Sequence, residues 1–292
     1  MEFKACLKKE YLETVRGKKF YSLLALSVGM ALFAMLYVLV MQLLKGVVDT
    51  NSEAGSQMSI MFEKSYMVGI TFFQAFMQSY FFIVLVIVFA NSISKQIKNK
   101  QWILPINAGM KPRNLILSKI VVSCISVLIC YLAGALLNFI FVISYCEPMG
   151  ATISDLLVSY LCGLVFIEFI VVVTISLNAI SKKMWVPIVV VFAGFILINA
   201  ILGNVILKVV DGVSITISDF TPFLFQSVAM AGGLMPYPWY AWLFATITMI
   251  AIALGLIVWA MFSNKVKPDK TKKTKVPKIK EIEAKQHKFY SF

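Results

Sequence analysis

Long uncharged stretches, separated by short charged clusters, dominate the hydrophobic pattern of this chain. A helix needs about 20 apolar residues to cross the hydrocarbon core of a bilayer, and each stretch is long enough. Five of them carry no charge and one, residues 156–181, carries only Glu168; the uncharged stretches are 20–44, 66–93, 120–146, 184–207 and 220–264. The pattern predicts an all-α integral membrane protein with six transmembrane helices, at about 20–44, 66–92, 120–145, 156–180, 184–207 and 239–262.

The first 19 residues have a different pattern, with an apolar residue at every fourth position. Phe3, Leu7, Tyr11 and Val15 share one face of a helix, and lysines occupy the other. This predicts an amphipathic helix that lies flat in the headgroup region of the inner leaflet. The alternative is a basic leader that only sets topology.

The remaining segments outside the spans are also distinct. Residues 208–238 begin polar and contain an apolar run, 223–231, that is too short to span, so we expect a short helix at the outer interface. Residues 263–292 carry ten lysines and little apolar sequence, which predicts a basic tail. The expected domains are therefore 1–19, a six-span domain over 20–262, and the tail 263–292.

The positive charges follow this topology. With six spans and both termini on one side, 24 of the 27 lysines and arginines fall on that side. Such a bias places both termini in the cytoplasm. Because the charge tracks the membrane pattern, it argues against a nucleic-acid partner.

The residue types that carry enzyme chemistry are scarce. The single histidine, His287, lies in the tail, and the five cysteines are scattered without a disulfide or zinc spacing. The sequence has no zinc-protease or nucleophile-elbow motif and no phosphate-binding loop of ATPases. We therefore expect no catalytic residue, cofactor site or metal site in this chain.

The segment between spans 2 and 3, residues 94–119, is the most informative. It contains six basic residues and no acid, together with the apolar Trp102, Ile103 and Leu104. We expect a short helix, a turn at residues 107–109, and a second helix that restarts near Pro112. An exposed apolar knob flanked by positive charge suggests a docking site for a cytoplasmic partner. The alternative is an ordinary positively charged loop.

This segment resembles the corresponding one in permeases of ABC-2 type exporters. The order of residues is similar, although Lys95, Lys98 and Lys100 stand where the family usually has an acidic residue and Gly-Thr. The matching residues are Asn99-Lys100-Gln101, Ile103-Leu104-Pro105, Lys111-Pro112-Arg113, Leu115-Ile116-Leu117 and Lys119. The amphipathic start resembles the elbow helix of that family, and the six-span layout is also similar.

The resemblance implies the transmembrane subunit of an ABC exporter, a dimer of identical or homologous permeases in the cytoplasmic membrane of a bacterium. ATP and magnesium would be bound by a separate cytoplasmic ATPase, and the permeases would work by alternating access. The ATPase-coupling residues that it implies are Gln101, Trp102, Ile103, Leu104, Pro105, Lys111 and Arg113.

Glu168 is the only ionisable residue well inside a predicted span. A charge at the centre of a bilayer costs about 2.5–3.5 kcal/mol on insertion scales, so the side chain is either neutral, paired or facing a cavity. It is a candidate for substrate contact or gating, or else a structural group at a helix interface.

Two other functions of the protein stay open: a secondary carrier or channel that works without ATP, and a membrane enzyme or scaffold.

Overall fold

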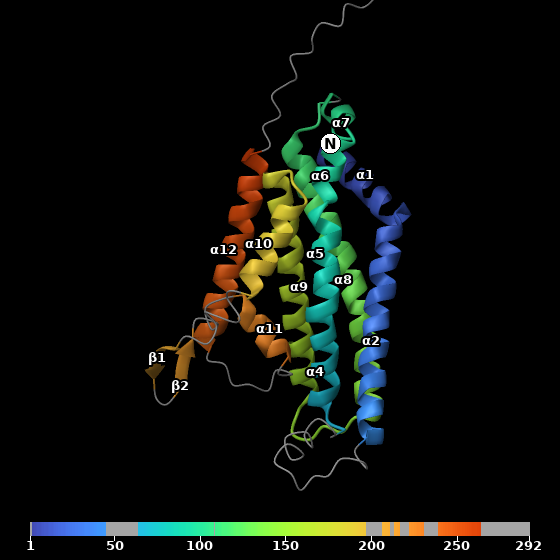
Figure 1. Cartoon of the computed structure of the whole chain (residues 1–292), viewed down its shortest axis with the longest axis vertical. Coiled ribbons are helices and arrows are strands. Elements are labelled where there is room, and N and C mark those ends of the chain that lie inside the picture. Colours follow the sequence, from blue (N-terminus) through green and yellow to red (C-terminus); the bar gives the residue numbers. More distant parts are fainter. Residues whose placement is uncertain are drawn as a thin grey trace, which may run out of the picture.

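The computed structural model describes residues 2–44, 64–107, 109–196, 206–210, 213–216, 222–230 and 239–263 of the 292-residue chain. Most of these residues form an elongated bundle of helices (Figure 1). The helices are α1 (Glu2–Arg16), α2 (Lys18–Leu44), α4 (Tyr66–Phe76), the π-helix η1 (Met77–Phe81), α5 (Phe82–Ala90), α6 (Ser92–Lys98), α7 (Ile103–Asn107), α8 (Pro112–Tyr145), α9 (Ile153–Ser181), α10 (Trp185–Ile196), α11 (Phe223–Met230) and α12 (Trp239–Ser263).

Five helices in the described ranges are long and apolar enough to cross a membrane. They are α2, the run Tyr66–Lys98, α8, α9 and α12. They correspond to predicted spans 1, 2, 3, 4 and 6, and they are compatible with a multi-pass membrane protein. The predicted fifth span, 184–207, contains the 12-residue helix α10; residues 197–205 lie outside the described ranges.

A short hairpin interrupts the helical pattern after α10. Strand β1 (Ile206–Val210) pairs antiparallel with β2 (Val213–Thr216). Residues 206 and 207 therefore belong to a strand, although the prediction assigned them to the end of span 5. The sequence carries a signal for this hairpin, because β-branched residues flank Asp-Gly at positions 211–212, a pair typical of tight hairpin turns.

Helix α9 occupies the centre of the bundle and packs against α5, α8, α10, α11 and α12 (Figure 1). Its first turn is closed by a capping box in which Thr152 and Asp155 bond each other's backbone amides. The short helix α11, expected at the interface, lies against α9 and α4, and Leu224, Val228 and Ala229 are buried there.

Helix α2 packs on α8 through small residues, and its large side chains point away from the bundle. Ser27, Ala31 and Ala34 are buried, whereas Phe33 and Leu36 are exposed. A Cβ added at Gly134 of α8 would lie 2.6 Å from the Ser27 hydroxyl, so the two backbones approach closely. Small residues at the contact and large apolar residues outside are typical of helices packed within lipid.

One end of the bundle collects positive charge. Helices α1, α6 and α7, the start of α8 and the end of α9 lie there, and α12 also ends there (Figure 1). We call this the basic end. Helix α8 has 34 residues and is therefore about 50 Å long, which exceeds the thickness of a hydrocarbon core of about 30 Å.

Candidate functional site

The segment between α5 and α8 folds as two short helices at the basic end. After α6 the chain turns at Lys100, whose φ is 57°, and after α7 it turns at Gly109, whose φ is +89°. Glycine adopts such a φ without steric cost, which explains its use at the second turn. Helix α8 then begins with Pro112 in its first turn, as the sequence predicted.

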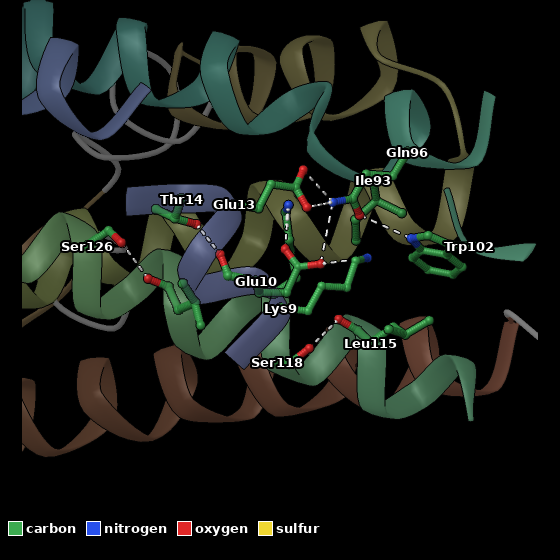
Figure 2. Close-up of polar contacts among 12 residues, drawn as sticks. Lys9, Glu10, Glu13, Thr14, Ile93, Gln96, Trp102, Leu115, Ser118 and Ser126 are labelled. Atoms are coloured by element: carbon green, nitrogen blue, oxygen red, sulfur yellow. Dashed lines mark hydrogen bonds and ion pairs between the residues drawn. The ribbon is translucent and has the colours of Figure 1, made fainter. Parts of the chain in front are cut away.

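Buried polar side chains tie this segment to α1 and α8 (Figure 2). Glu10 of α1 is 1% exposed, and its Oε2 lies 2.8 Å from Nζ of Lys119 in α8. The Gln96 side chain of α6 donates from Nε2 to Glu13 at 3.1 Å and to Glu10 at 3.4 Å. We call the network that these contacts form the basic-end network; with Trp102, described next, it consists of Glu10, Glu13, Gln96, Trp102 and Lys119.

Trp102 completes this network from the segment itself. Its Nε1 donates to Oε1 of Gln96 at 3.1 Å, and the side chain is only 5% exposed. The prediction of an exposed apolar knob is therefore wrong for Trp102, because an indole has a donor that Gln96 satisfies inside the fold. In contrast, the neighbouring Ile103 is 48% exposed.

The other predicted coupling residues divide between surface and interior. Gln101, Lys111 and Arg113 are exposed, and Pro105 is half-buried. The side chain of Leu104 lies outside the described residues. The exposed surface of this segment therefore combines Ile103 with several cations, and the buried Trp102 side chain anchors the segment to the bundle.

Helix α1 contacts the bundle with a face that the sequence analysis missed. Cys6 and Glu10 are buried, and the Cys6 thiol donates to the Met110 sulfur at 3.5 Å. Tyr11, on the predicted apolar face, is 57% exposed. Phe3, Leu7 and Val15 of that face are half-buried, and the acids Glu10 and Glu13 tie the helix to α8 and α6.

A second polar cluster lies deeper in the bundle and carries no charge. Gln74 of α4 donates from Nε2 to the Tyr131 hydroxyl of α8 at 2.9 Å, and Tyr131 donates to the carbonyl of Tyr160 in α9 at 3.0 Å. The Tyr160 hydroxyl donates to Asn138 Oδ1 at 2.6 Å. We call Gln74, Tyr131, Asn138 and Tyr160 the inner cluster.

Gly163 of α9 makes room for the inner cluster. A Cβ at this position would collide with Gln74 Oε1 and would lie 2.5 Å from the Tyr131 hydroxyl. Bonds between helices in a membrane contribute about 0.6 kcal/mol each on average, so the cluster fixes the relative positions of α4, α8 and α9 with modest stabilisation.

One turn after Gln74, the side chain of Gln78 has no such partners. It is 1% exposed and lies in the π-helix η1, and neither its amide oxygen nor its nitrogen has a hydrogen-bond partner among the described residues. Single π-turns within α-helices often mark functional positions. The sequence analysis did not single out this residue, because no local pattern identifies a π-turn.

Glu168 lies in the middle of α9, as its position in predicted span 4 required. It is half-buried beside the Cys124 thiol of α8, and within the described ranges its carboxylate oxygens have no hydrogen-bond partner of ordinary geometry. Its role as a path-lining or structural residue stays a prediction. In the same ranges, no three His, Cys, Asp or Glu side chains are grouped as metal ligands.

No family model, curated protein or solved structure matches this chain. Its function is therefore inferred from its own residues.

Proposed function

We propose that this chain is the permease subunit of an ATP-driven exporter and that a separate cytoplasmic ATPase drives it through the segment α6–α7. The basic end would then face the cytoplasm, in agreement with the bias of lysines and arginines. A second permease copy, or a homologous permease, would complete the transport path. The energy must come from a partner, because the sequence contains no phosphate-binding loop.

The observation that carries this proposal is the way the α6–α7 segment is held. A loop that only sets topology needs no buried anchors, yet Gln96 and Trp102 tie this one to Glu10 and, through Glu10, to Lys119 of α8. A push on the segment would therefore reach α1 and the first turns of α8 together. Since α8 packs against α2, α4 and α9, that movement would spread to most of the bundle.

The exposed side of the segment has the composition of a small docking surface. Ile103 provides exposed apolar area, and Lys111 and Arg113 provide positive charge nearby in the sequence. A central apolar anchor with a charged rim is the usual composition of a protein interface. The partner surface would be an apolar cleft edged with acidic residues.

A photo-crosslinking amino acid at position 103, in the chain expressed in its native membrane, tests the proposal directly. We expect it to capture an ATPase subunit that has a phosphate-binding loop. In a reconstituted complex, Ile103→Glu should weaken ATPase binding about tenfold or more, because it puts a charge where an apolar anchor is buried.

Met184→Glu is the matched control, since Met184 is an exposed apolar residue next to the end of α9, outside the segment. If the Ile103→Glu variant binds and stimulates the ATPase normally, the α6–α7 segment is not the docking site. Equal losses of ATPase binding in Met184→Glu and Ile103→Glu would also overturn this assignment.

A second candidate function is a carrier driven by an ion gradient. The π-helix in span 2, with its unpartnered Gln78, and the lone Glu168 favour it, because broken helices and intramembrane acids are typical of such carriers. Transport by the purified chain alone in proteoliposomes, driven by a proton gradient without ATPase or ATP, would support the carrier and exclude the exporter.

A further inference from the structure

The corner between α1 and α2 encloses a cavity of about 300 Å³ that the proposed function does not use. Gly17 forms this corner, and a Cβ there would lie 2.7 Å from the carbonyl oxygen of Glu13, so a larger residue would disturb the turn. The walls come from α1, α2, α5, α6 and α8. This volume is at the lower end of the range for small-molecule sites in proteins.

Positive charge dominates the polar side of the cavity. Lys18, Lys19 and Lys119 line it, and Glu13 is the one acid among the described lining residues. Glu13 is already bonded by Gln96, and Lys119 uses one of its three donors on Glu10. Lys18 and Lys19 are exposed at the α1–α2 corner. An anion entering the cavity would therefore meet more positive than negative charge.

An unpartnered hydroxyl also points to a ligand. Ser92 lines the cavity and is 5% exposed, and its Oγ has no hydrogen-bond partner among the described residues. A buried polar group without a partner destabilises a fold, so native structures seldom leave one without a hydrogen bond. The Ser92 Oγ is itself covered, and rotation of its side chain toward the cavity would let an oxygen of a bound ligand satisfy it.

Part of the remaining wall is apolar, and the side chains of Thr14, Ser123 and Ser126 complete it. Phe20, Leu23, Val88 and Phe89 line the cavity below the lysines. From Lys119 to Ser126, also in the lining, α8 advances about 10 Å toward the membrane interior. Tyr21 of α2, next to Phe20, is exposed. A ligand that fits is thus anionic at one end and apolar at the other.

We propose that this cavity binds the phosphate headgroup of an anionic membrane lipid. The phosphate oxygens accept from Lys18, Lys19 and the Ser92 hydroxyl, and the first carbons of the acyl chains lie against Phe20 and Phe89. Basic pockets at the cytoplasmic surface of transmembrane helices bind anionic headgroups by this chemistry. The lipid would hold the α1–α2 corner against α5 and α8.

Native mass spectrometry of the purified full-length chain tests the proposal, with short-chain phosphatidylglycerol, phosphatidylcholine and inorganic phosphate as probes. We expect one phosphatidylglycerol to bind at least tenfold more tightly than phosphatidylcholine. The double variant Lys18→Gln, Lys19→Gln should lose about tenfold in affinity or more, because a basic residue near the surface contributes about 1 kcal/mol to anionic-lipid binding and 1.4 kcal/mol is tenfold.

Two further variants separate this site from general charge attraction. Lys182→Gln with Lys183→Gln removes an exposed lysine pair at the same end of the bundle but outside the cavity, and should leave binding unchanged. Ser92→Ala, which changes no charge and removes an unpartnered hydroxyl, should lower affinity about fivefold without loss of thermal stability.

Equal binding of phosphatidylcholine would overturn the proposal. Equal losses in the two lysine pairs, or unchanged affinity in Ser92→Ala, would do the same. Displacement of phosphatidylglycerol by inorganic phosphate at equal concentration would show a site for free phosphate and would also overturn the lipid assignment.

Discussion

The basic-end network and the inner cluster both join helices through buried polar groups, but only the first contains charges. Glu10 and Lys119 form an ion pair at the basic end. Gln74, Tyr131 and Tyr160 are joined by neutral bonds further along the bundle. A charge within hydrocarbon costs several kcal/mol, and a neutral amide or hydroxyl costs less and needs fewer partners. In these two clusters the charged contact lies at the basic end and the neutral contacts lie further along the bundle, whereas Glu168 places one acid in the middle of α9.

Breaking the ion pair should give the largest effect. Lys119→Met leaves Glu10 buried with only Lys9, at 3.6 Å, and Gln96 near it. We expect about 3 kcal/mol of destabilisation, measured by denaturant unfolding of the purified protein. This is the lower end of the range for breaking a buried ion pair, because Lys9 still lies near Glu10.

The double variant Glu10→Leu, Lys119→Met is the control. Replacing a buried ion pair by apolar residues is often neutral, so most of the lost stability should return. If the double variant is as unstable as Lys119→Met, the loss does not come from an unpaired Glu10.

A single methyl group should disturb the inner cluster somewhat less. Gly163→Ala places a Cβ against Gln74 and Tyr131, and overpacking of this kind costs about 1–3 kcal/mol. We expect about 2 kcal/mol, seen as a lower midpoint in thermal unfolding.

Gly255→Ala in α12 is the matched control, because a Cβ there meets nothing within 4 Å. Alanine is a better helix former than glycine, so this variant should be neutral or slightly more stable. Equal effects of the two substitutions would show that the close approach at Gly163 is not a constraint.

The smallest effect distinguishes two glutamines one turn apart. Gln74→Met removes bonds to Tyr131 and to the Ser159 carbonyl, and should cost about 1 kcal/mol. Gln78→Met removes an amide without partners, so unfolding should show a gain of about 0.5 kcal/mol.

Transport by the Gln78→Met protein sharpens this comparison further. A stable variant that no longer transports would assign Gln78 to the path through the membrane, whereas a loss of stability equal to that of Gln74→Met would contradict the bonding described for the two residues.

The sequence predicted the spanning helices well where runs with at most one charge end at charged residues, as for α2 and α9. It was less accurate after α10, because the charge-free run 184–207 continues into the first two residues of the strand Ile206–Val210. It placed Trp102 on the surface, because no sequence pattern indicates that Gln96 accepts a hydrogen bond from the buried indole. The pairing of Glu10 with Lys119 joins residues over a hundred positions apart, and one sequence contains no pattern that reports such a contact.

The π-helix η1 has a consequence for the phase of the helix that contains it. Buried residues from Ile70 to Phe89 recur in pairs every four positions, and on a regular α-helix such a stripe would turn by about 40° with each repeat. The π-turn at Met77–Phe81 contains one more residue than an α-helical turn, and this extra residue offsets the drift of the stripe. Leu85 and Phe89 therefore face the bundle again. Span 2 therefore consists of two helical segments, one on each side of η1. Deletion of one residue between them would rotate one segment by about 100° relative to the other.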